Sequence, residues 1–451
     1  MRSQGYVAPG FEAVRDEFER NFTQRGEIGA AVAAYHRGEK VVDLWGGRRS
    51  PYSDAPWEED TLVIVYSSTK GISALTFAVA AARGWVDYDA PVARYWPEFA
   101  QNGKQAITVR QLLAHEAGLA CFDAPLSIRD LRDLDSLAAV LARQKPAWPP
   151  GTRHGYHAIS IGLYMQEIFR RVEPKHRTLG RFLREEITSQ LGVDFFIGLP
   201  AAIPARRLAT MQPLSAARAL LALPRAPHQL VLRILWPWSL LHKSMLFSDV
   251  DWNDRRQLEV EVLAGNGMGT ARAMARLYSV FAEGGAELGI DAKTLAELTA
   301  PPSARDAKDV LMGVPSYYSL GFLRPGPKPS FGSTPRAFGT PGAGGSFAFA
   351  DPDARLGYAY VMNKTDFYLL DDPREKALRD AIYAAIASRR PLDPTERRRQ
   401  QHDRAERDAV PGKRDEVVRG DEANQPAHAD QRAHERGREA DTEQRDVVRA
   451  E

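Results

Sequence analysis

The chain of 451 residues contains a single cysteine, Cys121, and no long uninterrupted apolar run. One cysteine excludes an intramolecular disulfide and a zinc cluster built on several thiolates. The first ten residues have no apolar core of the length that a signal peptide needs, and no later run is long enough to span a bilayer. We therefore expect a cytoplasmic protein that has no stable membrane insertion.

A strong charge of one sign is also missing. The chain has 60 lysine and arginine residues against 58 aspartate and glutamate residues, which gives a formal net charge of +2. This balance does not indicate nucleic acid or an anionic membrane as the main partner, and a small-molecule substrate fits better. The length exceeds that of one typical domain, so two structural units are expected. The oligomeric state is left open by the sequence.

Aromatic residues are absent from the last part of the chain. Residues 391–451 contain no Phe, Trp or Tyr and are rich in Arg, Asp, Glu, Gln and Ala. Such a composition cannot bury enough apolar surface to offset the entropy that ordering would remove. We predict a disordered charged tail over 391–451.

Residues 214–247 combine three prolines, two tryptophans and several leucines. Four basic residues interrupt this segment and exclude a membrane span: Arg218, Arg225, Arg233 and Lys243. Ordinary packing or a lid near the site is the favoured interpretation. Weak contact with a lipid interface is the alternative.

The two ends of the chain carry strand patterns, and its middle carries helical ones. Apolar runs at 28–35 and 40–47 predict a hairpin, and strand-like patterns return at 318–322, 346–350 and 356–362. Helical spacing of apolar residues predicts a helix before the hairpin, a last helix over 374–388 and a largely helical stretch between 71 and 298. We therefore predict an α+β fold with one antiparallel sheet flanked by helices and an all-helical second domain. The expected boundaries are 5–84 with 311–390 for the sheet domain, and 85–310 for the helical domain.

The sequence Ser67-Ser68-Thr69-Lys70 lies where an apolar, strand-like run at 62–66 gives way to a helical pattern. Residues three apart share a helix face, so this spacing places the Lys70 amine one turn from the Ser67 hydroxyl. A serine hydroxyl becomes a nucleophile when a nearby base takes its proton, and a buried lysine can be that base because burial lowers its pKa. The alternative is that Ser67 caps the helix and Lys70 is a solvated first-turn residue.

Two further stretches could complete such a site. Tyr156-His157-Ala158 follows a Pro-Pro-Gly turn, and a neighbouring Lys70 ammonium would favour the phenolate of Tyr156, which could then share in proton transfer. Glycines after Thr340-Pro341 would let the backbone approach a ligand and donate an N–H. The alternatives are a buried hydrogen-bonded tyrosine and a strand-opening glycine turn.

In this order, the three stretches resemble the serine β-lactamase-like family, which includes class C β-lactamases, penicillin-binding D-alanyl-D-alanine peptidases and family VIII carboxylesterases. The resemblance covers roughly residues 5–388. It implies the β-lactamase/transpeptidase fold, no metal and no organic cofactor. It also implies that Ser67 forms an acyl-enzyme, that Lys70 accepts its proton, and that Tyr156 assists as a general base and protonates the leaving group. The backbone N–H groups of Ser67 and Ala343 would form the oxyanion hole, beside Gly342.

Two departures from the family pattern affect the expected substrate. Thr340 stands where the family has lysine or histidine, and loss of a charge-assisted contact to a substrate carboxylate removes about 1.5–3 kcal/mol. Ala158 stands where the family has an asparagine or a related residue. Both changes favour a carboxylesterase that acts on small to medium neutral esters. The alternatives are an acyltransferase using the same acyl-enzyme, a β-lactamase or peptidase, and a catalytically impaired binding scaffold. His115 is expected to have a structural, hydrogen-bonded role.

Overall fold

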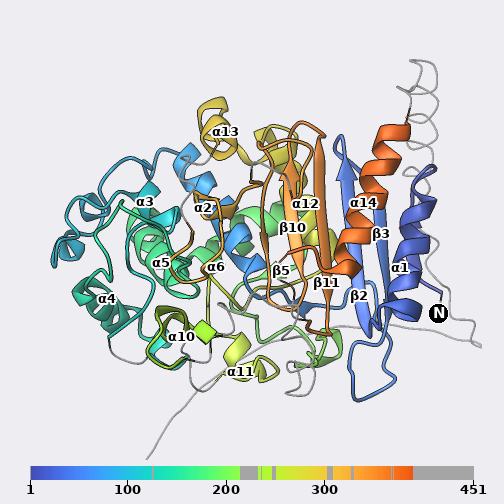
Figure 1. The fold of residues 1–451 in the computed structure, drawn as a ribbon, viewed down its shortest axis with the longest axis horizontal. Helices are drawn as coiled ribbons and strands as arrows, with labels where there is room; N and C mark the ends of the chain where they lie inside the picture. The colour runs from blue at the N-terminus through green and yellow to red at the C-terminus, as the bar shows by residue number, and fades with distance from the viewer. Residues whose placement is uncertain are drawn as a thin grey trace, which may run out of the picture. The chain divides into compact units, whose positions relative to one another are not determined.

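An eight-stranded antiparallel sheet joins the two ends of the chain, in the order β1-β3-β2-β11-β10-β9-β8-β7 (Figure 1). Its strands are β1 (Gln4–Val7), β2 (Gly29–His36), β3 (Glu39–Gly47), β7 (Tyr318–Ser319), β8 (Phe322–Leu323), β9 (Phe338–Pro341), β10 (Phe347–Asp351) and β11 (Leu356–Met362). Strand β2 pairs with β11, from the other end of the chain, in a register that runs from His36 opposite Leu356 to Ala30 opposite Met362. This pairing confirms the prediction of one antiparallel sheet built from both ends of the chain.

Helices cover both faces of this sheet. Successive residues of β11 point to opposite faces. The Tyr358 hydroxyl donates to the Glu375 carbonyl of α14 (Pro373–Ser388), which packs with α1 (Glu12–Gln24). On the other face, α12 (Ala271–Ala282) approaches so closely that a Cβ on Gly357 would lie 2.4 Å from the Ser279 nitrogen. The sheet is therefore the middle layer, and glycine at 357 permits the close approach of α12.

The remaining helices lie mainly between Ser68 and Thr299. They are α2 (Ser68–Ala82), α3 (Val109–Leu113), α4 (Leu134–Arg143), α5 (Ser160–Val172), α6 (Leu179–Phe182), α7 (Ser189–Leu191), α10 (Leu240–Ser244), α11 (Arg255–Leu258) and α13 (Ala292–Thr299). Short helical turns are η1 (Val92–Arg94), η2 (Pro97–Phe99), η3 (Asp130–Arg132), η4 (Leu183–Thr188), η5 (Ala205–Arg207) and η6 (Ala286–Leu288). A small second sheet has the order β4 (Val63–Ile64), β6 (Met268–Gly269), β5 (Phe195–Phe196).

The computed structural model describes residues 2–123, 126–213, 232–234, 236–245, 250–301, 308–326, 330–366, 368 and 370–389. Met1–Arg390 form one compact unit. The predicted disordered tail over 391–451 lies outside the described residues, as does much of the segment 214–247. No helix in the described ranges combines the length and apolar character needed to cross a membrane.

Two sequence predictions of strands were wrong in detail. The run 318–322 is not one strand, because Leu320 and Gly321 both have positive φ angles and form a turn between β7 and β8. The run 62–66 forms only the two-residue strand β4, because the chain turns at Tyr66. The division into domains at 84 and 311 stays a prediction. Helix α12 lies against the sheet although it falls within the predicted helical range.

Candidate active site

A sharp turn places Ser67 at the start of α2. Tyr66 has a φ of 46°, which is uncommon for a residue with a side chain and often marks a functional position. Ser67 occupies the position before the first helical residue, but its side chain does not cap the helix. Instead, its Oγ lies 2.9 Å from Lys70 Nζ and 2.8 Å from the Tyr156 hydroxyl. The interpretation of Ser67 as a helix cap is therefore wrong, and its hydroxyl faces two proton-transfer groups.

Lys70 is buried, with 1% of its surface exposed. Besides Ser67, its Nζ donates to the Ala264 carbonyl at 2.8 Å. Burial lowers the pKa of Lys70 to about 7, because the charged ammonium loses its hydration. At neutral pH a large fraction of this lysine is therefore an amine that can accept the Ser67 proton. The alternative of a solvated first-turn lysine is wrong.

Tyr156 keeps its proton at neutral pH. Burial raises its pKa to about 12; the hydrogen bond with Ser67 opposes this effect and the Asp309 carboxylate adds to it. Lys70 Nζ lies over the ring face, 4.9 Å from the centroid. The expectation that the Lys70 ammonium favours the Tyr156 phenolate is therefore wrong. The hydroxyl is a donor to Ser67, and Lys70 is the only one of the two suited to be the base at neutral pH.

Asp309 positions the loop that carries Tyr156, and sequence reasoning missed it. Its Oδ2 accepts the Tyr156 backbone N–H at 2.8 Å, and its Oδ1 accepts the N–H groups of Leu311 and Met312, each at 2.8 Å. The carboxyl is fully buried, and burial raises its pKa while these backbone N–H groups oppose the rise. Tyr156 and Asp309 are 153 residues apart, so no local spacing could have indicated the pair.

Two buried histidines hold the same loop. The His157 backbone N–H donates to His115 Nδ1 at 3.0 Å. The His157 ring accepts the Leu119 N–H at Nε2, 3.0 Å away, and lies 2.6 Å from the Gly155 carbonyl through Nδ1. Burial lowers the pKa of His157 to about 4 and that of His115 well below its ordinary value. Both are therefore neutral, and His115 has the hydrogen-bonded role that we expected.

The end of β9 brings Thr340 and Gly342 to the turn before Ser67. A Cβ on Gly342 would lie 2.3 Å from the Val65 carbonyl and 2.2 Å from Ser346 Oγ, so only glycine fits there. Ala343 follows in an exposed turn. Among the described residues, neither the Ser67 N–H nor the Ala343 N–H has a hydrogen-bond acceptor. Two such donors are what an oxyanion requires.

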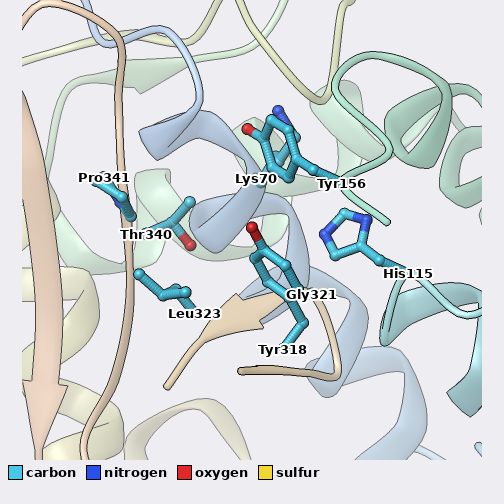
Figure 2. Close-up of a pocket in the computed structure, with 8 residues that line it drawn as sticks. All are labelled: Lys70, His115, Tyr156, Tyr318, Gly321, Leu323, Thr340 and Pro341. Carbon is cyan, nitrogen blue, oxygen red and sulfur yellow. The ribbon is translucent and has the colours of Figure 1, made fainter. Parts of the chain in front are cut away.

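A cavity of about 40 Å³ opens beside these groups. Its lining residues are Lys70, His115, Tyr156, Tyr318, Gly321, Leu323, Thr340 and Pro341 (Figure 2). Figure 2 shows His115 on one side of Lys70 and Tyr156, with Thr340 and Leu323 on the other. Ala158 is buried and does not line the cavity. The volume suits about three waters or an acyl group of a few atoms.

Comparison with known proteins identifies the family to which this chain belongs. The family described as Beta-lactamase matches residues 15–381. This chain belongs to the beta-lactamase family. The chain is 33% identical to the esterase/beta-lactamase LipL of Mycobacterium tuberculosis, over 80% of its length and 82% of that protein.

Two solved structures match this chain over 85% of its length, and each match covers 100% of the chain in the solved structure. One is a family VIII carboxylesterase at 38% identity with a TM-score of 0.76. The other is a penicillin-binding protein homolog from Caulobacter crescentus at 36% identity with a TM-score of 0.74. The predicted fold class and family are confirmed. As a member of this family, the protein is a serine hydrolase.

Proposed function

We propose that this protein is a carboxylesterase that acts on neutral esters of small to medium size through an acyl-enzyme on Ser67. The contact of the Ser67 hydroxyl with both Lys70 and Tyr156 is the observation that carries this proposal. The names of two relatives, an esterase/beta-lactamase and a family VIII carboxylesterase, support ester substrates.

The first half of the reaction forms the acyl-enzyme. Ser67 Oγ attacks the ester carbonyl carbon while its proton passes to the Lys70 amine. The negative charge moves to the carbonyl oxygen, where the N–H groups of Ser67 and Ala343 stabilise it. The bond to the alcohol then breaks, and the Tyr156 hydroxyl gives its proton to the leaving alkoxide. A water molecule then relays a proton from the Lys70 ammonium to the Tyr156 phenolate, so both groups return to their starting states.

The second half releases the acid. A water molecule replaces the alcohol and attacks the acyl carbon while Lys70 accepts its proton. The same two N–H groups stabilise the second oxyanion, and the bond from the acyl carbon to Ser67 Oγ breaks. Oγ takes the proton back, which regenerates the free enzyme.

The cavity lining supports a neutral substrate. Lys70 is the one lysine or arginine among the described residues that line the cavity, and burial keeps the lining histidine neutral. Thr340 offers a hydroxyl rather than a positive charge, and Leu323 and Pro341 are apolar. Lys70 must be a neutral amine to act as the base, so the described lining offers no other cation to replace the hydration that a substrate carboxylate would lose. The volume of about 40 Å³ favours a short acyl chain.

A direct test is hydrolysis of p-nitrophenyl esters from acetate to octanoate, with wild type and Ser67→Ala side by side and nitrocefin as a β-lactam substrate. The proposal expects ester turnover that depends on Ser67, is highest for short acyl chains, and exceeds nitrocefin cleavage. Nitrocefin cleavage above ester turnover would favour a β-lactamase. No turnover of either substrate would contradict the proposal.

A further inference from the structure

Helix α10 and the residues just before it carry an exposed apolar patch. Four large apolar side chains there are mostly exposed: Leu232 at 67%, Trp236 at 60%, Trp238 at 72% and Met245 at 56%. We call these four residues the tryptophan patch. Its two indole rings contact each other edge to face, with centroids 5.6 Å apart. The sequence-based preference for ordinary packing is therefore wrong for these two tryptophans.

The exposure does not come from a loosely held backbone. The Trp236 N–H donates to the Leu232 carbonyl at 2.9 Å, and the Ser239 hydroxyl caps α10 by accepting the His242 N–H at 3.0 Å. On the inner side, Ile234, Leu240 and Leu241 pack in an apolar cluster with Trp148 and Leu311 among its members. The segment is thus two-sided: one set of apolar residues is anchored in the protein and another faces solvent.

The tryptophan patch lies on the Tyr156 side of the active site. The Arg233 guanidinium donates to the carbonyls of Val310 and Leu311 at 2.8 and 3.0 Å. These residues directly follow Asp309, whose carboxylate holds the Tyr156 backbone. A surface that contacts the patch would therefore lie next to the loop that carries Tyr156.

The segment that carries the patch has a basic side chain at its surface. Residues 232–245 contain no aspartate or glutamate. Lys243 is exposed within α10 itself. Exposed tryptophans beside an exposed lysine are typical of a surface that contacts anionic lipid.

We propose that the tryptophan patch docks on an anionic lipid surface and presents the active site to esters dissolved in that surface. Tryptophan rings settle at the level of the lipid headgroups, and the Lys243 ammonium is attracted to the negative surface. Docking needs no membrane span. The second half of the proposal, on the substrates, rests on the proposed esterase function.

The docking half is tested with the Ser67→Ala protein, so that binding is measured without turnover. The probe is co-sedimentation with vesicles of phosphatidylcholine containing about one third phosphatidylglycerol. Replacing both Trp236 and Trp238 by serine should lower the partition coefficient at least about tenfold, because two large apolar surfaces no longer leave water. Lys243→Gln should lower it about fivefold, and only on anionic vesicles. Tyr52→Ser is the matched control, because Tyr52 is 74% exposed outside the patch and its loss should leave binding unchanged.

Three outcomes would overturn the docking proposal: no vesicle binding, binding that survives loss of both tryptophans, and a dimer in solution that disappears when they are replaced. The last outcome would assign the patch to a second copy of the chain.

The substrate half is tested with active enzyme. The variant without both tryptophans should lose rate on an ester held in the vesicles and keep its rate on a water-soluble ester. Equal rates of wild type and variant on the vesicle ester would overturn this half. If no ester is hydrolysed in either form, the proposed function fails while vesicle binding by Ser67→Ala still stands.

Discussion

At the scale of single residues, the proposed mechanism requires a group that can accept the Ser67 proton at neutral pH. Lys70 and Tyr156 both contact Ser67, but burial moves their proton affinities in ways that suit opposite tasks. It lowers the pKa of Lys70 to about 7 and raises that of Tyr156 to about 12. Burial disfavours the charged form in both cases, so the lysine becomes a base and the tyrosine stays an acid.

The pH dependence of ester hydrolysis follows from these two values. The Lys70 amine must be unprotonated, so kcat/KM should rise with pH, with a midpoint near 7. The rate should then stay level through pH 10, because Tyr156 keeps its proton until about 12. Initial rates with a neutral p-nitrophenyl ester across pH 5–10 measure this profile. A midpoint above pH 9, or a fall in rate between pH 8 and 10, would contradict the assignment.

Burial of the Lys70 amine should lower the free energy of unfolding at neutral pH. Its folded pKa lies below the unfolded value of 10.5, so the unfolded chain binds more protons between pH 7 and 10.5 and the free energy of unfolding rises with pH there. Lys70→Met should therefore abolish turnover and raise the free energy of unfolding at pH 7 by about 1–4 kcal/mol. Urea unfolding of wild type and Lys70→Met at pH 7 and pH 10 measures this difference in the free energy of unfolding. The stabilisation by Lys70→Met should be smaller at pH 10. A destabilised variant at pH 7 would contradict this account.

The residue scale also indicates what the sequence could predict. Ser67 and Lys70 are three apart on one helix, so their contact follows from local spacing. The direction of the Lys70 pKa shift was likewise predictable from burial. The state of Tyr156 was not, because it depends on the burial of the side chain, which raises its pKa. That burial is produced by segments far apart in the sequence.

At the scale of elements, the site is assembled where separate segments meet. Helix α2 brings Ser67 and Lys70, the loop before α5 brings Tyr156, and β9 brings Thr340. The hairpin β2–β3 and the strands β10 and β11 were predictable from their apolar runs and strand-like alternation. The short strands β5 and β6 were not, because two-residue strands carry no periodicity and their partners lie far away in the sequence.

Asp309 is expected to be a positioning residue, acting through the Tyr156 loop. Asp309→Asn keeps the size of the side chain but replaces one acceptor oxygen by a donor nitrogen. The Asp309 carboxylate accepts three backbone N–H groups, and the new amide nitrogen cannot accept any of them. The substitution should therefore lower the free energy of unfolding by about 1–3 kcal/mol and kcat by about 10- to 100-fold. The pH midpoint near 7 should not move, because Lys70 is untouched. Asp54→Asn is the control, since the Asp54 side chain is 99% exposed. An unchanged kcat in a folded Asp309→Asn protein would exclude the positioning role.

At the scale of the whole molecule, the catalytic unit ends near Arg389. The family match stops at residue 381, and Met1–Arg390 form one compact unit. The Arg389 side chain still belongs to this unit, because it donates to the Pro9 carbonyl at 2.6 Å and lies over the Phe11 ring.

Truncation after Arg389 should leave the catalytic unit intact. We expect the melting temperature to stay within about 2 °C and kcat/KM on short esters to stay within about twofold, because the family match ends at residue 381 and residues 391–451 have no aromatic side chain to add to a core. Circular dichroism melting and ester kinetics on the full and truncated chains measure both. A large loss of either would assign a structural role to residues 391–451.

The assignment of Ser67 as nucleophile is tested most directly by locating a covalent adduct. A fluorophosphonate should add one phosphonyl group to the wild type, and peptide mass spectrometry should place it on Ser67. Ser67→Ala should stay unlabelled. Ser68→Ala should be labelled like the wild type, because the Ser68 hydroxyl is engaged with Ser346. An adduct on another residue, or labelling that persists in Ser67→Ala, would contradict the account.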